Sequence, residues 1–223
     1  MANKRRNRLF PVLFLAAGLT VQVTAYLWMP DNPWSLVSGL LGICSVILCS
    51  ERNILTFFFG FGQILTYTYL CYLERFYAGI AMNGFYFCSQ IYGIYVWRRR
   101  LPTDEDTDRQ RLNITTRSLP RSMIAVGMPM LLALAVITGY LLSRYTSDTQ
   151  PFFDALTTVP AIAAQILMVL AYREQWYIWL FIDILYVAMW ASAGNACMVM
   201  QYVFWCANCI YGMVQWRKHP SGL

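Results

Sequence analysis

The chain has 223 residues, of which 58% are hydrophobic, 16% aromatic and only 13% charged. A soluble domain of this size needs more polar surface, so the composition excludes an ordinary soluble globular protein and indicates a membrane protein. The net charge of +6 does not indicate a nucleic-acid partner, because the most basic region, 97–121, also carries four carboxylates, Asp104, Glu105, Asp106 and Asp108. We expect membrane lipid to surround the chain and no nucleic acid to bind it.

The sequence predicts an all-α polytopic membrane protein with eight transmembrane helices. In chain order they cover 9–29, 34–50, 53–73, 76–97, 122–142, 153–172, 175–192 and 195–216. Each has about 17 to 22 residues, enough to cross a hydrocarbon layer of roughly 30 Å. The first follows a basic start, but it is too long for a signal peptide and lacks a small-residue cleavage site, so we expect it to remain as a helix.

Basic residues fall almost entirely on alternate connections between these spans. One set of connections holds fifteen of them: Lys4, Arg5, Arg6, Arg8, Arg52, Arg98, Arg99, Arg100, Arg109, Arg111, Arg117, Arg121, Arg173, Arg217 and Lys218. The other set holds only Arg75 and Arg144. Because basic connections stay on the cytoplasmic side, this distribution predicts that both termini are cytoplasmic.

An internal repeat links the two halves of the chain. At an offset of 119 residues, 85–100 (FYFCSQIYGIYVWRRR) matches 204–219 (FWCANCIYGMVQWRKH) at six of sixteen positions. The charged turns Glu51-Arg52 and Arg173-Glu174 lie at comparable places, though they need an offset of 122. We therefore predict two parallel three-helix repeats, since one additional span between them restores the direction of the second.

This repeat divides the chain into six expected segments. They are a basic N-terminus with an extra helix (1–33), the first repeat (34–97), a charged cytoplasmic loop (98–121), a linker helix with an outer loop (122–150), the second repeat (151–216) and a cytoplasmic tail (217–223).

Polar and aromatic residues recur at steps of three and four along three spans, which places each set on one helix face. The sets are Asn83, Tyr86, Gln90, Gly93 and Trp97; Trp176, Trp179, Asp183, Tyr186 and Trp190; and Gln201, Trp205, Asn208 and Gly212. Gln63 and Gln165 lie near the middle of two further spans. Polar side chains are costly in hydrocarbon, so these faces indicate the interior of the bundle.

Such faces can hold helices together or bind a ligand. We assign Trp97, Trp216, Gly93, Gly212 and Gln201 to helix packing, because small and polar residues mediate contacts between membrane helices. We predict that the ligand contacts Gln63, Asn83, Tyr86, Gln90, Gln165, Trp176, Trp179, Asp183, Tyr186, Trp205 and Asn208. Aromatic rings with amides and one acid suit a planar heteroaromatic ring that carries hydroxyls, which is a vitamin- or nucleoside-like solute.

Asp183 is the strongest single indication of function. It is the one carboxylate far from a span end, and no span contains a Lys, Arg or His that could pair with it. An enzyme is disfavoured, because the single histidine, His219, lies in the tail and no metal-ligand cluster, activated nucleophile or phosphate-binding loop is present. We expect no catalytic residue, metal or cofactor. A purely structural protein would leave Asp183 unexplained.

From residue 34 to 218 the chain resembles the PnuC family of bacterial nicotinamide riboside transporters. The motifs that carry the resemblance are Phe76-Tyr77-Ala78-Gly79 with Asn83, Tyr86, Gln90, Tyr92-Gly93 and Trp97, and Trp176-Tyr177-Ile178-Trp179 with Asp183, Asn208, Tyr211-Gly212 and Trp216. The resemblance implies a SWEET-like three-plus-one-plus-three bundle, often trimeric, in the bacterial inner membrane. It also implies facilitated diffusion of nicotinamide riboside, with a cytoplasmic kinase that traps the product by phosphorylation.

The chain departs from the family pattern at one position. The polar residue after the tryptophan pair is often Asn, whereas here it is Asp183. The alternative substrates are therefore those associated with related transporters, namely thiamine, riboflavin and deoxynucleosides. Thiamine is a cation like nicotinamide riboside, while riboflavin and deoxynucleosides are neutral. Proton-coupled uptake, with Asp183 as the carrier, is the other alternative.

Overall fold

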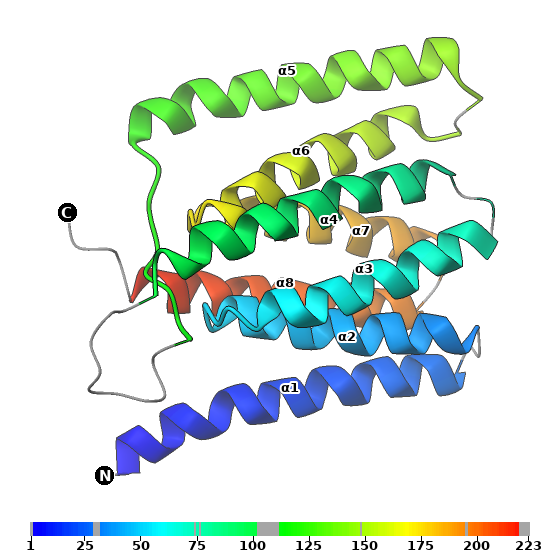
Figure 1. The fold of residues 1–223 in the computed structure, drawn as a ribbon. Coiled ribbons are helices and arrows are strands. Elements are labelled where there is room, and N and C mark those ends of the chain that lie inside the picture. Colours follow the sequence, from blue (N-terminus) through cyan, green and yellow to red (C-terminus); the bar gives the residue numbers. More distant parts are fainter. Residues whose placement is uncertain are drawn as a thin grey trace.

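A computed structural model describes residues 2–28, 32–73, 75, 77–101, 112–147, 149–194 and 196–218. It contains eight helices: α1 (Ala2–Trp28), α2 (Pro33–Ser50), α3 (Thr56–Leu73), α4 (Tyr77–Arg98), α5 (Arg121–Tyr145), α6 (Pro151–Val169), α7 (Gln175–Ser192) and α8 (Ala196–Arg217) (Figure 1). The predicted all-helical fold is confirmed, with helix ends shifted by a few residues. Most of the charged loop, Phe76 and His219 lie outside the described residues.

Four of these helices, α1, α2, α5 and α6, are long and apolar enough to count as membrane spans by length and hydropathy alone. The other four, α3, α4, α7 and α8, carry most of the tyrosine, tryptophan and amide residues singled out above. Those side chains lower the hydropathy of a helix even when they face the interior of a bundle. The helices with the weakest hydropathy are therefore the ones that carry the candidate site.

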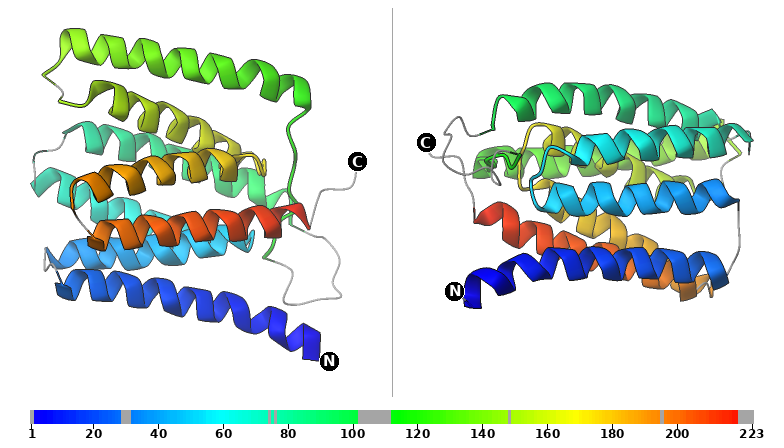
Figure 2. Two further views of the ribbon diagram at one scale, coloured as in Figure 1. Left: turned by 180° about the vertical axis from the view of Figure 1, so that it is seen from behind. Right: turned by 60° about the horizontal axis from the view of Figure 1, so that its bottom comes forward.

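Six helices form a closed ring. Contacts run from α2 to α3, α4, α6, α7 and α8 in turn, and α8 contacts α2 again. The first repeat supplies α2 to α4 and the second supplies α6 to α8, so the predicted repeat arrangement is confirmed. Helix α1 covers the junction of α2 and α8, while α5 packs on α6 at the opposite flank (Figures 1 and 2).

The two repeats end their first helices in the same way. At the end of α2, Arg52 N–H donates to Cys49 O (2.8 Å) and Asn53 N–H to Leu48 O (2.9 Å). At the end of α6, the amides of the residues 119 positions later make the same pair of bonds, to Met168 O and Leu167 O. Both are Schellman motifs, in which one residue adopts a left-handed conformation to satisfy the last carbonyls of the helix.

The left-handed residues are Arg52 (φ 61°) and Ala171 (φ 63°). Neither is a glycine, so each turn bears a backbone cost of about 1–2 kcal/mol. Arg52 and Ala171 are 119 residues apart, so the two turns are equivalent at the same offset as the repeat. The charged pairs Glu51-Arg52 and Arg173-Glu174, which required an offset of 122, are therefore not structurally equivalent.

Both turns lie at the end of the bundle where α2, α4, α6 and α8 finish. We call it the basic end, because Arg52, Arg98, Arg117, Arg173 and Arg217 are all found there. The N-terminus of α1 and the C-terminus of α8 lie at the same end (Figure 1). The opposite end of the bundle is called the distal end.

The main buried cluster lies at the basic end, where the two repeats pack against each other. It contains Cys49, Phe57, Trp97, Ile114, Ala171, Trp176, Cys209 and Trp216. Trp97 and Trp216 meet edge to face, with ring centroids 5.9 Å apart. Gly93 and Gly212 admit the rings of Phe57 and Trp176, because a Cβ at either glycine would collide with them.

Two reciprocal hydrogen bonds join the repeats within this cluster. Trp97 Nε1 at the end of α4 donates to Met168 O of α6 (3.2 Å). Trp216 Nε1 at the end of α8 donates to Cys49 O of α2 (2.9 Å). Donors and acceptors are both 119 residues apart, so each repeat uses its last tryptophan to cap the first helix of the other. The packing role predicted for Trp97 and Trp216 is confirmed.

Candidate transport site

The candidate site lies inside the ring, between the buried cluster and the distal end. Asp183 is eight residues into α7, which places it roughly 12 Å from the basic end of that helix. Its side chain is 9% exposed. Cys209 Sγ of α8 donates to Asp183 Oδ2 at 3.4 Å. Cys209 also belongs to the buried cluster, so the site and the cluster are in direct contact. Within the described part of the chain, no basic side chain lies within ion-pair distance of Asp183.

Four tyrosines from four helices gather near this carboxylate. Tyr67 of α3, Tyr86 of α4, Tyr186 of α7 and Tyr202 of α8 lie near one another across the repeat boundary, and Tyr202 also lies near Asp183. The rings of Tyr186 and Tyr202 stack, with centroids 4.8 Å apart and an interplanar angle of 21°. The site therefore presents flat faces and hydroxyls beside one acid.

The predicted amides take two kinds of position. Asn83 is 5% exposed, and its Nδ2 is buried without a partner among the described residues. Gln90 lies against Gly60 and Gln63 against Gly42, where a Cβ would collide with or crowd the amide. These glycines thus make space for side chains of the neighbouring helices, and the Nδ2 donor of Asn83 remains unused.

Gln165 and Asn208 make contacts between helices. Gln165 Nε2 of α6 donates to Ser89 Oγ of α4 (2.9 Å), and Ser50 Oγ of α2 donates to Asn208 Oδ1 of α8 (3.0 Å). These are the two places where the repeats meet. Asn208 is fully buried, and its Nδ2 has no partner in the described structure, so it too keeps a donor available.

The predicted tryptophans are spread over different depths. Trp176 is 2% exposed and belongs to the cluster, edge to face with Trp216 at 5.8 Å. Trp179 is partly buried and packs against the cluster one turn further in. Trp205 of α8 is partly buried beside Phe204, with centroids 6.0 Å apart. Trp176 thus lies between the site and the basic end, while Trp179 adjoins the site.

Sequence reasoning missed Tyr67 and Tyr202. Both are the repeat equivalents of predicted residues, since Tyr67 lies 119 positions before Tyr186 and Tyr202 lies 119 positions after Asn83. Tyr86 and Trp205, which were predicted, are related in the same way. Applying the repeat offset to each predicted residue would have found the two missing tyrosines.

A ring of six helices in two parallel repeats, with polar and aromatic residues on its inner faces, defines a polytopic membrane transporter. The sequence model of the family described as nicotinamide mononucleotide transporter matches residues 32–218. The chain therefore belongs to this family.

Relatives of known name support the assignment. The chain is 29% identical to a nicotinamide riboside transporter PnuC of Haemophilus influenzae, over 94% of this chain and 90% of that one. It is 26% identical to the PnuC of Neisseria mucosa, over 94% and 81%. A crystal structure of the vitamin B3 transporter PnuC superimposes with a TM-score of 0.73 at 26% identity, covering 94% of this chain and 91% of that one.

Proposed function

We propose that this protein transports nicotinamide riboside by facilitated diffusion. The observation that carries the proposal is Asp183, a carboxylate within a tyrosine-lined ring of helices and without a basic partner in the described structure. Nicotinamide riboside combines a flat pyridinium ring with ribose hydroxyls. The ring would stack on aromatic faces, its positive charge would lie near Asp183, and Asn83 and Asn208 would bind hydroxyls or the carboxamide.

The same carboxylate argues against the phosphorylated form of the solute. A nucleotide phosphate carries one to two negative charges, and the candidate site residues include an acid but no Lys or Arg. Two like charges in a site of low dielectric repel each other strongly. The riboside therefore fits this site better than the mononucleotide does.

Supporting expectations complete the proposal. The substrate would cross unchanged, so the chain would not act as an enzyme, and a cytoplasmic kinase would trap the product by phosphorylation. The basic end would face the cytoplasm with both termini, in the bacterial inner membrane. The protein would assemble as a homotrimer, as the resemblance to PnuC implies.

Two alternatives concern the substrate and the energy source. Thiamine is also an aromatic cation and would use Asp183 in the same way. Proton-coupled uptake is favoured by one contact, the Cys209 thiol on the Asp183 carboxylate, because an acid that has a weak neutral donor and no cation is a reasonable proton carrier.

Competition in liposomes distinguishes these substrates. Purified protein would be given labelled nicotinamide riboside together with an excess of unlabelled nicotinamide riboside, nicotinamide mononucleotide, thiamine, riboflavin or deoxyadenosine. We expect only the first to reduce uptake to background. Inhibition by thiamine at a much lower concentration than by unlabelled nicotinamide riboside would reassign the substrate.

A further inference from the structure

Residues 112–117 form a short extended segment that crosses the basic end of the bundle, which we call the strap. On one side it pairs with the turn between α2 and α3. Ile54 N–H donates to Leu112 O (2.8 Å), and Ile114 N–H donates to Arg52 O (3.0 Å). Arg52 Nη1 returns a bond to Ile114 O (2.9 Å). Arg52 is only 8% exposed, so this bond is buried.

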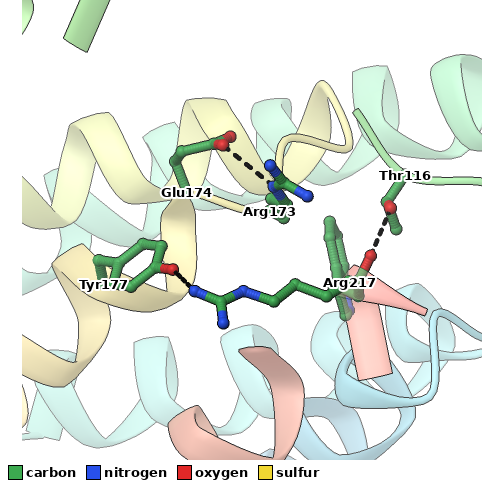
Figure 3. A network of polar contacts seen from close by, with 6 residues as sticks. Thr116, Arg173, Glu174, Tyr177 and Arg217 are labelled. Atoms are coloured by element: carbon green, nitrogen blue, oxygen red, sulfur yellow. Dashed lines mark hydrogen bonds and ion pairs between the residues drawn. The ribbon is translucent and has the colours of Figure 1, made fainter. Parts of the chain in front are cut away.

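On its other side the strap pairs with the equivalent turn of the second repeat. Arg117 N–H donates to Ala171 O (2.7 Å), and Arg173 N–H donates to Arg117 O (3.0 Å). Between these anchors, Thr116 Oγ1 donates to Trp216 O at the end of α8 (2.7 Å). Figure 3 shows Thr116 with this bond beside Arg217, the last residue of α8. The left-handed residues Arg52 and Ala171 therefore each offer a carbonyl to the strap, one from each repeat.

The strap also fills the space between the repeats. Ile114 is fully buried among Trp97, Trp176 and Trp216, whose rings come from α4, α7 and α8. This cluster contains Cys209, which contacts Asp183. The cluster and the strap thus lie in succession between the candidate site and the basic end. Beyond Asp183, in contrast, Tyr67 is 45% exposed although it neighbours Tyr186 of the other repeat.

A solute that leaves the ring at the basic end has to pass between the two repeats. The strap holds both repeats together at that point, so the turns cannot separate while all of its anchors are intact. Most of these anchors are backbone hydrogen bonds made by turn residues rather than by residues within a helix, and a single hydrogen bond contributes little net stability. The strap can therefore release one repeat without unfolding a helix.

We propose that the strap is the gate at the basic end: it seals the path while bound to both repeats, and transport requires its release from at least one of them. Ile114 is the plug, and Arg52 and Thr116 hold it in place. The proposal rests on the proposed transport function, and it also makes a prediction that is independent of transport.

Disulfide locks test the gate directly. Asn53 and Asn113 form a non-hydrogen-bonded antiparallel pair, whose Cα atoms lie about 4.5 Å apart, within disulfide range. The Asn53→Cys/Asn113→Cys variant would fix the strap to the first repeat. Arg117→Cys/Tyr172→Cys, at the parallel bridge, would fix it to the second. The single variants are the matched controls.

We expect at least one lock to reduce nicotinamide riboside uptake in liposomes at least about tenfold, since a transporter held in one state cannot cycle, and reduction to restore it. Quantitative formation of both disulfides, verified by mass spectrometry, with no change in uptake would overturn the proposal. If the wild-type chain itself fails to take up the compound, the proposed function fails instead.

Native cysteines provide a readout that needs no substrate. Cys49 and Cys209 are buried in the cluster under the strap, and Cys71 is equally buried on α3 toward the distal end. We expect Ile114→Ala to raise the rate of maleimide modification of Cys49 and Cys209 at least about tenfold, because loss of a buried isoleucine shifts a conformational equilibrium by more than that. The rate at Cys71 should not change.

The control variant is Thr115→Ala, on the same strap but exposed, which should leave all three rates unchanged. Equal acceleration at Cys71 in Ile114→Ala would indicate general loosening of the fold, and unchanged rates at Cys49 and Cys209 would show that the plug does not control access. Either result would contradict the gate.

Discussion

Replacing the single acid of the site by its isosteric amide, Asp183→Asn, removes one negative charge and almost no volume. Cys209 can still donate to the amide oxygen, so the packing seen around Asp183 is retained. The variant should therefore fold. Its effect on binding then reports the contribution of charge.

The size of this effect follows from the position of Asp183. The side chain is 9% exposed and, among the described residues, has no basic partner, so a bound pyridinium would be its main counter-charge. Two unit charges about 5 Å apart at an effective dielectric constant near 20 attract by about 3 kcal/mol. Desolvation of both groups offsets part of this, which leaves about 1.5–2.5 kcal/mol, or roughly 10- to 70-fold in Kd.

The assay compares two ligands that differ mainly in charge. Binding to purified protein would be measured by calorimetry for nicotinamide riboside and for its reduced, neutral dihydropyridine form. We expect Asp183→Asn to weaken binding of the cation by the stated factor and to leave the neutral form within about twofold. Equal losses for both ligands, or no loss for the cation, would refute the claim that Asp183 acts through its charge.

Three further predictions test stacking, packing and orientation. Trp179→Ala should weaken binding by roughly 1–3 kcal/mol, the range for stacking on one ring, whereas Trp34→Ala, at a side chain that is 46% exposed, should not; equal losses would indicate general destabilisation. Trp97→Phe and Trp216→Phe each remove one indole bond to a helix-terminal carbonyl, and each should lower the melting temperature by a similar amount, at a cost of at least about 1 kcal/mol; an unchanged melting temperature in one of them would contradict the reciprocal role. A fluorescent protein fused after residue 223 should fluoresce and alkaline phosphatase fused there should be inactive; active phosphatase would reverse the assigned orientation.

Helix number, helix order and the repeat could be predicted because they depend on local patterns. Each span is a run of apolar residues of sufficient length, and the repeat is visible as identical residues at a fixed offset. The face that carries Trp176, Trp179 and Asp183 could be predicted because helical periodicity fixes which residues share a side. The same periodicity does not fix depth, so the sequence did not separate Trp176, within the packed cluster, from Asp183, in the site.

Long-range contacts were beyond the sequence. Tyr67 is one of three tyrosines on α3 and Tyr202 is one of two on α8, so no helical pattern singles them out. Only the repeat offset marks them in the sequence, and the ring arrangement brings them beside Tyr186. The strap was hidden for a different reason: 112–117 has no periodicity and lies in a loop whose charges are typical of a solvated linker. Its structure depends on carbonyls exposed by two left-handed turns at Arg52 and Ala171, and such turns are expected at glycine rather than at arginine or alanine.

Uptake into liposomes that contain only the purified protein tests the central claim most directly. Labelled nicotinamide riboside would be followed with no ion gradient, and then with an inward proton gradient at the same outer concentration. Facilitated diffusion predicts that the internal concentration rises to the external value, that it stops there, and that the proton gradient does not change this level. Accumulation above the external concentration in the presence of the gradient, or no entry above that of empty liposomes, would contradict the account.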